Sequence, residues 1–160
     1  MQMQKTSSDP ALLVARIAMA ALFIPGGLRH LMDLGAFAAM LHKQGVPGAD
    51  VLAPIGACVE FFGSIAVLVG FQLRIATLLL ILFTIIASFI AHRFWEFEGA
   101  ARQMQQTNFF KNLAIIGGFC ALWAAGAGRY ALDRWLHRER FERRSGERRA
   151  KGTTPVAMTR

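Results

Sequence analysis

The sequence predicts an all-α integral membrane protein, built as a bundle of four transmembrane helices. Hydrophobic residues make up 54% of the 160 positions, and the mean hydropathy is +0.39. These residues gather into four blocks, each near the roughly 20 residues that a helix needs to cross a hydrocarbon core about 30 Å thick. The third block is apolar on every side, whereas a helix of a soluble bundle would show a polar face with a period of about 3.6 residues.

The first predicted span covers residues 11–28 and is interrupted by Arg16. Asp9 and Pro10 precede it in the order of an N-cap and a first-turn proline. A cleavable signal peptide is the alternative interpretation of this block. Its basic segment would contain only Lys5 and its apolar run would be broken by an arginine, so a membrane span is favoured.

The other three predicted spans follow a longer loop. The second covers residues 51–71 and holds a single carboxylate, Glu60. The third covers residues 74–94 and is uncharged throughout its interior. The fourth covers residues 109–128 and carries Lys111 near its start. Each has the length that a membrane crossing requires.

The chain therefore divides into an N-terminal segment (residues 1–10), a membrane domain (residues 11–128) and a basic tail (residues 129–160). The loop after the first span contains MDLGAFAAMLHKQG, in which apolar residues recur at helical spacing. Asp33 is suited to cap this segment and Gly45 to end it. The loop thus predicts a short helix that lies in the membrane interface.

The distribution of lysine and arginine predicts the orientation. Because the number of spans is even, both termini share a side, and that side collects most of the basic residues, including Arg74, Arg129 and Arg134. Basic residues near the ends of spans are retained in the cytoplasm. We therefore expect a multi-pass protein of the plasma membrane with both termini cytoplasmic.

The tail sequence DRWLHRERFERRSGERRAK supplies most of the net charge of +8. A solvated or disordered tail that fixes the topology accounts for these residues. An alternative is an interfacial segment that contacts anionic lipid, with Trp135, Leu136 and Phe141 toward the bilayer. Nucleic-acid binding is the sharper alternative, and we expect the lipid bilayer rather than nucleic acid as the partner.

An ionised group in mid-membrane is costly, so it normally faces protein or water and pairs with another group. Counting about 1.5 Å per helical residue places Glu60 roughly 12 Å and Arg16 roughly 18 Å below the outer boundary. Arg16 is therefore the predicted partner of Glu60, and small residues beside both charges allow close helix approach. Lys111 and His92, nearer the outer boundary, extend this predicted polar network.

Three hypotheses for the network remain open. A buried ion pair between Arg16 and Glu60 would only hold the helices together. Alternatively, Glu60 would titrate as part of a proton or substrate pathway, and it would then spend time as the neutral acid. Simple snorkelling of Arg16 and Lys111 to the nearer interface is the third hypothesis.

The cysteines and histidines predict neither a redox-active cysteine pair nor a metal site. Cys58 and Cys120 fall on different spans and form no CxxC pair, so they are interpreted as small apolar residues, with a disulfide or thiol relay as the alternative. A metal site is not expected, because no single element shows ligand spacing. Its donors would have to come from separate segments: His30, His42, His92, Asp33 and Glu96.

Taken in order, these features resemble the DoxX family of small four-helix membrane proteins. The resemblance covers about residues 11–128 and depends on the order of the motifs rather than on any one of them. The motifs are Arg16, Gly45 to Pro47, Glu60 with Gly63, Gly70 before Arg74, His92 to Trp95, and Phe109 to Asn112 ahead of Gly117 and Gly118.

The resemblance implies a bacterial inner-membrane protein. The family is named for a membrane subunit of a quinone-linked thiosulfate oxidoreductase, and some relatives are associated with oxidoreductase or thiol-redox assemblies. The leading expectation is a non-catalytic subunit or scaffold of such an assembly, with no catalytic residues of its own. The matching FFKN motif adds Asn112 to the expected polar network.

Two alternatives to a scaffold stay open. A redox subunit would bind quinone, the one cofactor considered, near the outer helix ends. Its expected contacts are His30, His92, Trp95 and Lys111. A small proton or solute transporter would instead use Glu60. A homo-oligomer is compatible with each of these hypotheses.

Overall fold

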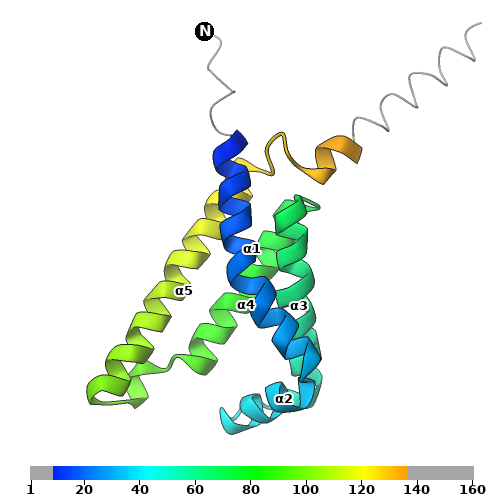
Figure 1. Ribbon diagram of the computed structural model, residues 1–160. Helices are drawn as coiled ribbons and strands as arrows, with labels where there is room; N and C mark the ends of the chain where they lie inside the picture. The colour runs from blue at the N-terminus through cyan, green and yellow to red at the C-terminus, as the bar shows by residue number, and fades with distance from the viewer. Residues whose placement is uncertain (1–8, 137–160) are drawn as a thin grey trace, which may run out of the picture.

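The computed structural model of the chain describes residues 9–136 (Figure 1). Over this range the secondary structure is helical, with no strand. The helices are α1 (Asp9–Met32), α2 (Leu34–Lys43), α3 (Ala49–Val69), α4 (Leu73–Ala91), the short 3-10 helix η1 (Phe94–Glu96) and α5 (Gly99–Ala125). Four helical segments are long and apolar enough to cross a membrane, which confirms the predicted fold class. The predicted tail from residue 137 onward lies outside the described residues.

Two helices extend beyond the predicted spans. α1 continues past residue 28 to Met32, because Gly26 and Gly27 stay within the regular helix and do not end it. α5 begins at Gly99 rather than near residue 109, since the polar segment before that point is rich in good helix formers. The extension of α1 matters most, because it moves His30 from a loop into a helix.

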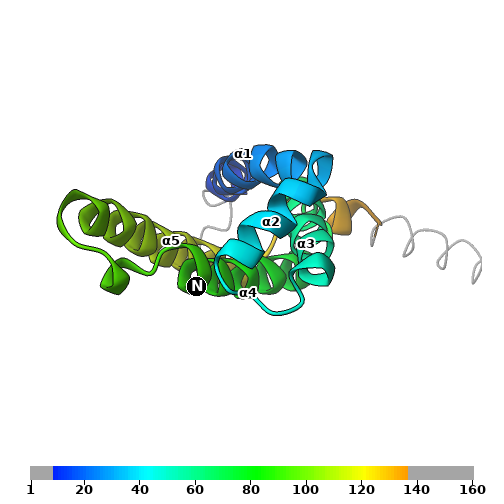
Figure 2. The ribbon, with the colours of Figure 1, turned by 90° about the horizontal axis from the view of Figure 1, so that it is seen from below.

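The short helix expected after the first span is α2. The Asp33 side chain accepts a hydrogen bond from the backbone N–H of Ala36 at 2.9 Å, as an N-cap does. Phe37 and Leu41 are buried against an alanine stripe on α3. This stripe consists of Ala49, Ala53 and Ala57, all fully buried. α2 is thereby fixed across one end of the bundle (Figures 1 and 2).

The four long helices pack as two pairs. α1 packs mainly against α3, and α4 packs mainly against α5 (Figure 1). α3 and α4 join the pairs through a tight turn at the end where α1 begins and α5 finishes. We call this the Arg16 end, and we call the opposite end, crossed by α2, the α2 end. Away from the Arg16 end, α5 diverges from α1 in both views (Figures 1 and 2).

The α1–α3 contact is closest at a glycine. A Cβ atom added to Gly27 would lie 2.7 Å from the backbone nitrogen of Phe61 and 2.8 Å from its Cα. Only a residue without a side chain allows the two backbones to approach this far. A buried apolar cluster then fills the middle of the bundle, where Phe23 and Phe119 pack with ring centroids 5.3 Å apart.

Candidate functional site

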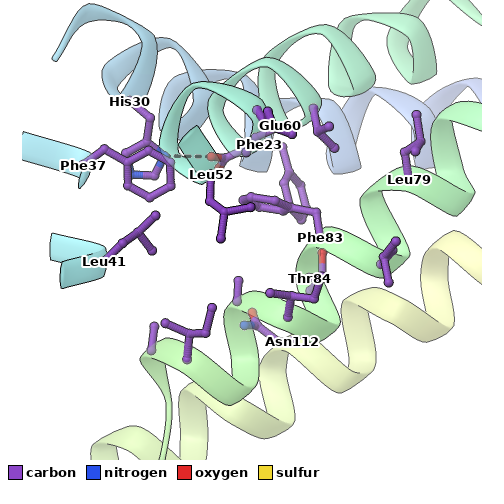
Figure 3. A pocket seen from close by; sticks show the side chains of 18 of the residues that line it. Phe23, His30, Phe37, Leu41, Leu52, Glu60, Leu79, Phe83, Thr84 and Asn112 are labelled. Atoms are coloured by element: carbon purple, nitrogen blue, oxygen red, sulfur yellow. Dashed lines mark hydrogen bonds and ion pairs between the residues drawn. The ribbon is translucent and has the colours of Figure 1, made fainter. Parts of the chain in front are cut away.

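A cavity of about 600 Å³ opens between the helices at the α2 end (Figure 3). All five α-helices contribute to its wall, and most of the lining side chains are aliphatic or aromatic. Phe83 and Leu79 of α4 and Leu52 of α3 are typical of this apolar surface. Its volume falls within the roughly 300–1,000 Å³ of small-molecule sites. The few polar groups on the wall therefore determine how a ligand would be oriented.

The first polar group of the cavity is a pair formed by His30 of α1 and Glu60 of α3. The Nδ1–H of His30 donates to Oε2 of Glu60 at 2.8 Å, as the dashed line in Figure 3 marks. The Glu60 side chain is only 10% exposed and that of His30 is 23% exposed. In a low-dielectric site such a charge-assisted bond is stronger than it would be in water.

Neighbouring residues fix the geometry of this pair. The His30 ring stacks on Phe37 of α2, with centroids 4.0 Å apart and planes inclined by 10°. Gly26 leaves room for the carboxylate, because a Cβ atom there would lie 2.6 Å from Oε1 of Glu60. With Nδ1 bonded to Glu60, Nε2 is the ring nitrogen of His30 left for a ligand.

The second polar group lies on the other side of the cavity, on α4 and α5. The Asn112 amide donates to the hydroxyl of Ser88 at 3.0 Å, and Ser88 in turn donates to the Thr84 carbonyl at 2.6 Å. In Figure 3, Asn112 and Thr84 lie across the cavity from His30 and Glu60. Lys111 also lines the cavity and donates to Asn108 at 3.2 Å. The cavity thus has two polar edges separated by apolar side chains.

Arg16 does not pair with Glu60, and this expectation is corrected. Its guanidinium is 1% exposed and donates to four backbone carbonyls at the Arg16 end. The bonds run to Val67 at 3.0 Å, Leu68 at 2.6 Å, Ala127 at 2.7 Å and Tyr130 at 3.0 Å. These carbonyls belong to the last turn of α3 and the segment after α5. The Val67 carbonyl also accepts the backbone N–H of Gly70 at 3.2 Å.

The predicted ligand contacts separate into two groups. His30 and Lys111 line the cavity. His92 instead hydrogen-bonds to Gln105 of α5 at 2.8 Å, outside the lining. Trp95 of η1 belongs to an aromatic cluster between the end of α4, η1 and α5, which also contains Phe89, Phe94, Phe109 and Phe110. Aromatic residues near the ends of membrane-spanning segments are typical of the membrane interface.

The remaining candidate groups stay apart. Among residues 9–136, no three His, Cys, Asp or Glu side chains lie close enough to hold a metal ion. His42 is bonded to Asp50 at 3.2 Å on the exposed side of the α2 end. Cys58 and Cys120 are exposed, unbonded residues on α3 and α5.

The partnership of His30 with Glu60 was not predicted, although the sequence contained a signal for it. Arg16, Ala20, Phe23 and Gly27 form the buried stripe of α1. Continuing this stripe by one further helical step reaches His30. The predicted loop at residues 29–49 places His30 outside the first helix, so His30 was not considered as a partner of Glu60.

The sequence profile of the DoxX family matches residues 11–93 of the chain, which is more than half its length. This chain belongs to the DoxX family. Arg16, His30 and Glu60 all lie within the matched range, whereas Lys111 and Asn112 lie beyond it. The profile therefore covers Arg16, all of the first polar edge of the cavity, and the α4 residues Thr84 and Ser88 of the second edge.

Two relatives of this DoxX-family chain come from Escherichia coli K12. Inner membrane protein YqjF is 34% identical over 135 residues, covering 84% of this chain and 98% of the relative. Inner membrane protein YphA is 32% identical over 123 residues, covering 77% and 88%. A Surfeit locus protein 4 homolog from Schizosaccharomyces pombe is 32% identical over 69 residues, covering 42% and 23%. No solved structure matches the chain significantly.

Both bacterial relatives are named as inner membrane proteins, and the alignments span nearly all of their length. Together with the four helices able to cross a bilayer, they identify this DoxX-family chain as an integral inner-membrane protein. The cavity at the α2 end is therefore surrounded by helices whose outer faces meet lipid.

Proposed function

We propose that this DoxX-family protein is a non-catalytic membrane subunit that holds a small amphipathic molecule for an oxidoreductase or thiol-redox partner. The observation that carries the proposal is the cavity of about 600 Å³ with apolar walls and two polar edges. A fold alone does not define a function, whereas this cavity limits which molecules the protein can bind. A ligand that reaches the cavity from lipid needs an apolar body and few polar atoms.

A quinone of the membrane pool has the properties that this cavity would select. Its ring carries oxygens at opposite edges, and the cavity carries polar groups on opposite walls (Figure 3). A bound quinone would supply reversible two-electron, two-proton redox chemistry to the partner. The apolar side chains of Phe83, Leu79 and Leu52 would pack against its ring and tail.

The polar residues can serve both redox forms of such a ring. In neutral His30, Nδ1 donates to Glu60 and Nε2 accepts a hydrogen bond, as a ring hydroxyl would require. In the imidazolium form Nε2 donates instead, as a ring carbonyl would require. On the opposite wall, the carbonyl oxygen of Asn112 accepts and the ammonium of Lys111 donates. These residues would orient the ring, and electron transfer would belong to the partner.

A binding role accounts for the geometry better than a transport role. A pathway through Glu60 would have to continue to the Arg16 end. Phe23, Phe119 and Leu80 pack in the buried cluster between the cavity and that end. Arg16 then links α1 to the end of α3 and to the segment after α5. The cavity is thus closed toward that end and partly open elsewhere. This arrangement supports retention of a ligand.

The proposal includes an orientation with both termini in the cytoplasm. Arg74, Arg129 and Arg134 all lie at the Arg16 end, next to the start of α1. Retention of basic residues in the cytoplasm would place the Arg16 end inside and the α2 end outside. The cavity would then serve the outer leaflet.

Affinity purification from native membranes in mild detergent tests the proposed partnership. The expected result is co-purification of a membrane or membrane-associated oxidoreductase, identified by mass spectrometry. The ratio of this partner to the tagged chain should stay constant through washing. A matched purification of an unrelated tagged inner-membrane protein is the control. Repeated isolation of the chain alone, at wild-type expression levels, would contradict a subunit role.

A further inference from the structure

A second cleft lies at the Arg16 end, apart from the cavity at the α2 end. It has a volume of about 420 Å³ and lies between the α3–α4 turn and the segment that follows α5. Gln72 and Arg74 line one side, and Ala131, Asp133 and Arg134 line the other. This cleft is more polar than the cavity at the α2 end, and the groups on its wall are charged.

Its depth in the membrane is marked by aromatic side chains. Trp123, Tyr130 and Trp135 are all about half exposed at this end, and Phe71 of the α3–α4 turn is 43% exposed. Tryptophan and tyrosine gather at the level of the lipid headgroups. The cleft therefore lies at headgroup depth, whichever side of the membrane the Arg16 end faces.

Two guanidinium groups in the cleft are available to a ligand. Within residues 9–136, neither the Arg74 guanidinium nor the Arg134 guanidinium donates to a carboxylate or to another hydrogen-bond acceptor. Arg74 is instead held over the ring of Trp123, with its guanidinium carbon 5.9 Å from the centroid. Asp133 adds one carboxylate to the same wall, so the three side chains carry a net positive charge.

We propose that this cleft binds the phosphate of an anionic phospholipid with a hydroxylated headgroup, such as phosphatidylglycerol. Arginine matches a phosphate with a planar fork of donors, and two arginines at one cleft provide two such forks. Asp133 would accept hydrogen bonds from the headgroup hydroxyls. Basic pockets between transmembrane helices at the membrane surface are suited to lipid headgroups.

The apolar flank of the cleft favours a lipid over a free anion. Ile75 and Leu78 follow Arg74 on α4, and each is 59% exposed toward the surroundings of the helix. Acyl chains that descend from a phosphate at Arg74 would cover these side chains. A free phosphate ion would leave this surface uncovered.

The test compares thermal unfolding of the purified full chain in nanodiscs of phosphatidylcholine with and without phosphatidylglycerol. Native mass spectrometry of the same samples counts the phosphatidylglycerol molecules retained. We expect phosphatidylglycerol to raise the unfolding midpoint and to remain bound to wild-type protein. Each arginine near a membrane surface contributes about 1 kcal/mol, so the Arg74→Gln/Arg134→Gln variant should bind this lipid roughly 25-fold more weakly.

Matched variants make the result decisive. The Lys43→Gln/Arg102→Gln variant loses the same charge from exposed positions at the α2 end and should behave as wild type. The Arg74→Lys/Arg134→Lys variant keeps the charge and should retain part of the effect, which also shows that substitution here does not unfold the chain. Equal losses in the α2-end variant and the Arg74/Arg134 variant would overturn the proposal.

A further experiment distinguishes binding of a phospholipid headgroup from binding of a free phosphate ion. Inorganic phosphate at millimolar concentration, added to the protein in detergent, should leave the unfolding midpoint unchanged. A midpoint raised by inorganic phosphate as far as by phosphatidylglycerol would show a free-anion site and would overturn the lipid assignment. Equal retention of phosphatidylcholine and phosphatidylglycerol would show no preference for an anionic headgroup and would also overturn the proposal.

Discussion

The two ends of this bundle use a buried ionisable residue in opposite ways. At the Arg16 end, one buried guanidinium donates to four backbone carbonyls. At the α2 end, Glu60 has one side-chain partner, His30, and both residues face a cavity. The buried charge of Arg16 therefore holds backbone segments together, whereas Glu60 lines a cavity.

The Arg16 end also depends on a glycine. Gly70, in the turn after α3, has a φ of 71°, which favours a residue without a side chain. A Cβ atom there would lie 2.7 Å from Cβ of Ala131 and 3.0 Å from the guanidinium carbon of Arg16. The turn, the segment after α5 and the arginine thus pack closely around Gly70, beside the cleft that Arg74 and Arg134 line.

The largest effect should come from Arg16→Met. This change removes a buried donor that four backbone carbonyls share, so the free energy of unfolding should fall by about 3–5 kcal/mol. Unfolding in a mixed detergent titration followed by circular dichroism measures the loss. The exposed Arg102→Met variant is the control and should unfold with wild-type protein. A wild-type unfolding curve for Arg16→Met would show that the Arg16 end needs no such fastening.

A double variant separates this arrangement from an ion pair between Arg16 and Glu60. If the two residues formed a pair, adding Glu60→Gln to Arg16→Met would restore stability. Because Arg16 and Glu60 have different partners, the losses in the free energy of unfolding of the two single variants should add within about 0.5 kcal/mol. Recovery of stability in the double variant would contradict the assignment of partners.

The next largest effect is expected for Gly27→Ala, between the two ends. The added Cβ would meet the Phe61 backbone at under 3 Å, so α1 and α3 would have to separate. Overpacking of this kind costs about 1–3 kcal/mol. The control is Gly117→Ala, where nothing lies within 4 Å of the new atom. Similar stability of the two variants would mean that the α1–α3 contact is looser than described.

A smaller effect is expected for Glu60→Gln at the α2 end. The amide keeps the shape of the side chain and replaces a charge-assisted bond to His30 by a neutral one, which costs about 1 kcal/mol. The same unfolding titration measures it. A loss as large as that of Arg16→Met would show that the two ends do not differ in the way described.

The smallest effect on stability should be that of Lys111→Gln. Its ammonium is exposed and has one hydrogen bond, to Asn108. We expect an unfolding midpoint indistinguishable from wild type, together with weaker ligand binding because a donor at the cavity is lost. Unchanged binding would remove Lys111 from the site and leave Asn112 as the polar group on that wall.

The sequence was sufficient to predict the helices and several of the important residues. Block length and hydropathy predicted the four spans, and Asp33 with the apolar spacing predicted α2. These features are local, so they can be found without knowing how the helices cross. Arg16 and Glu60 were also correctly placed on buried faces.

The partners of the charged residues could not be predicted in the same way. Estimated depths in the membrane show only which charged side chains lie near Arg16. They do not show that backbone carbonyls at helix ends, which are equally good acceptors, lie within its reach. The carbonyls of Ala127 and Tyr130 come within reach only because the chain after α5 folds back over α3. That return, like the divergence of α5 from α1 that shapes the cavity, depends on tertiary packing.

The most direct test of the central claim is a binding titration with a short-chain ubiquinone analogue, followed by tryptophan fluorescence of the purified protein. Gly56 lies on the cavity wall, where a Cβ atom would be 3.6 Å from Phe37 and Phe83, so Gly56→Leu fills the space. Gly117→Leu adds the same side chain to an open face of α5. We predict saturable binding in wild type and Gly117→Leu and its loss in Gly56→Leu. Absence of binding in wild type, or equal binding in all three proteins, would contradict a ligand cavity at the α2 end.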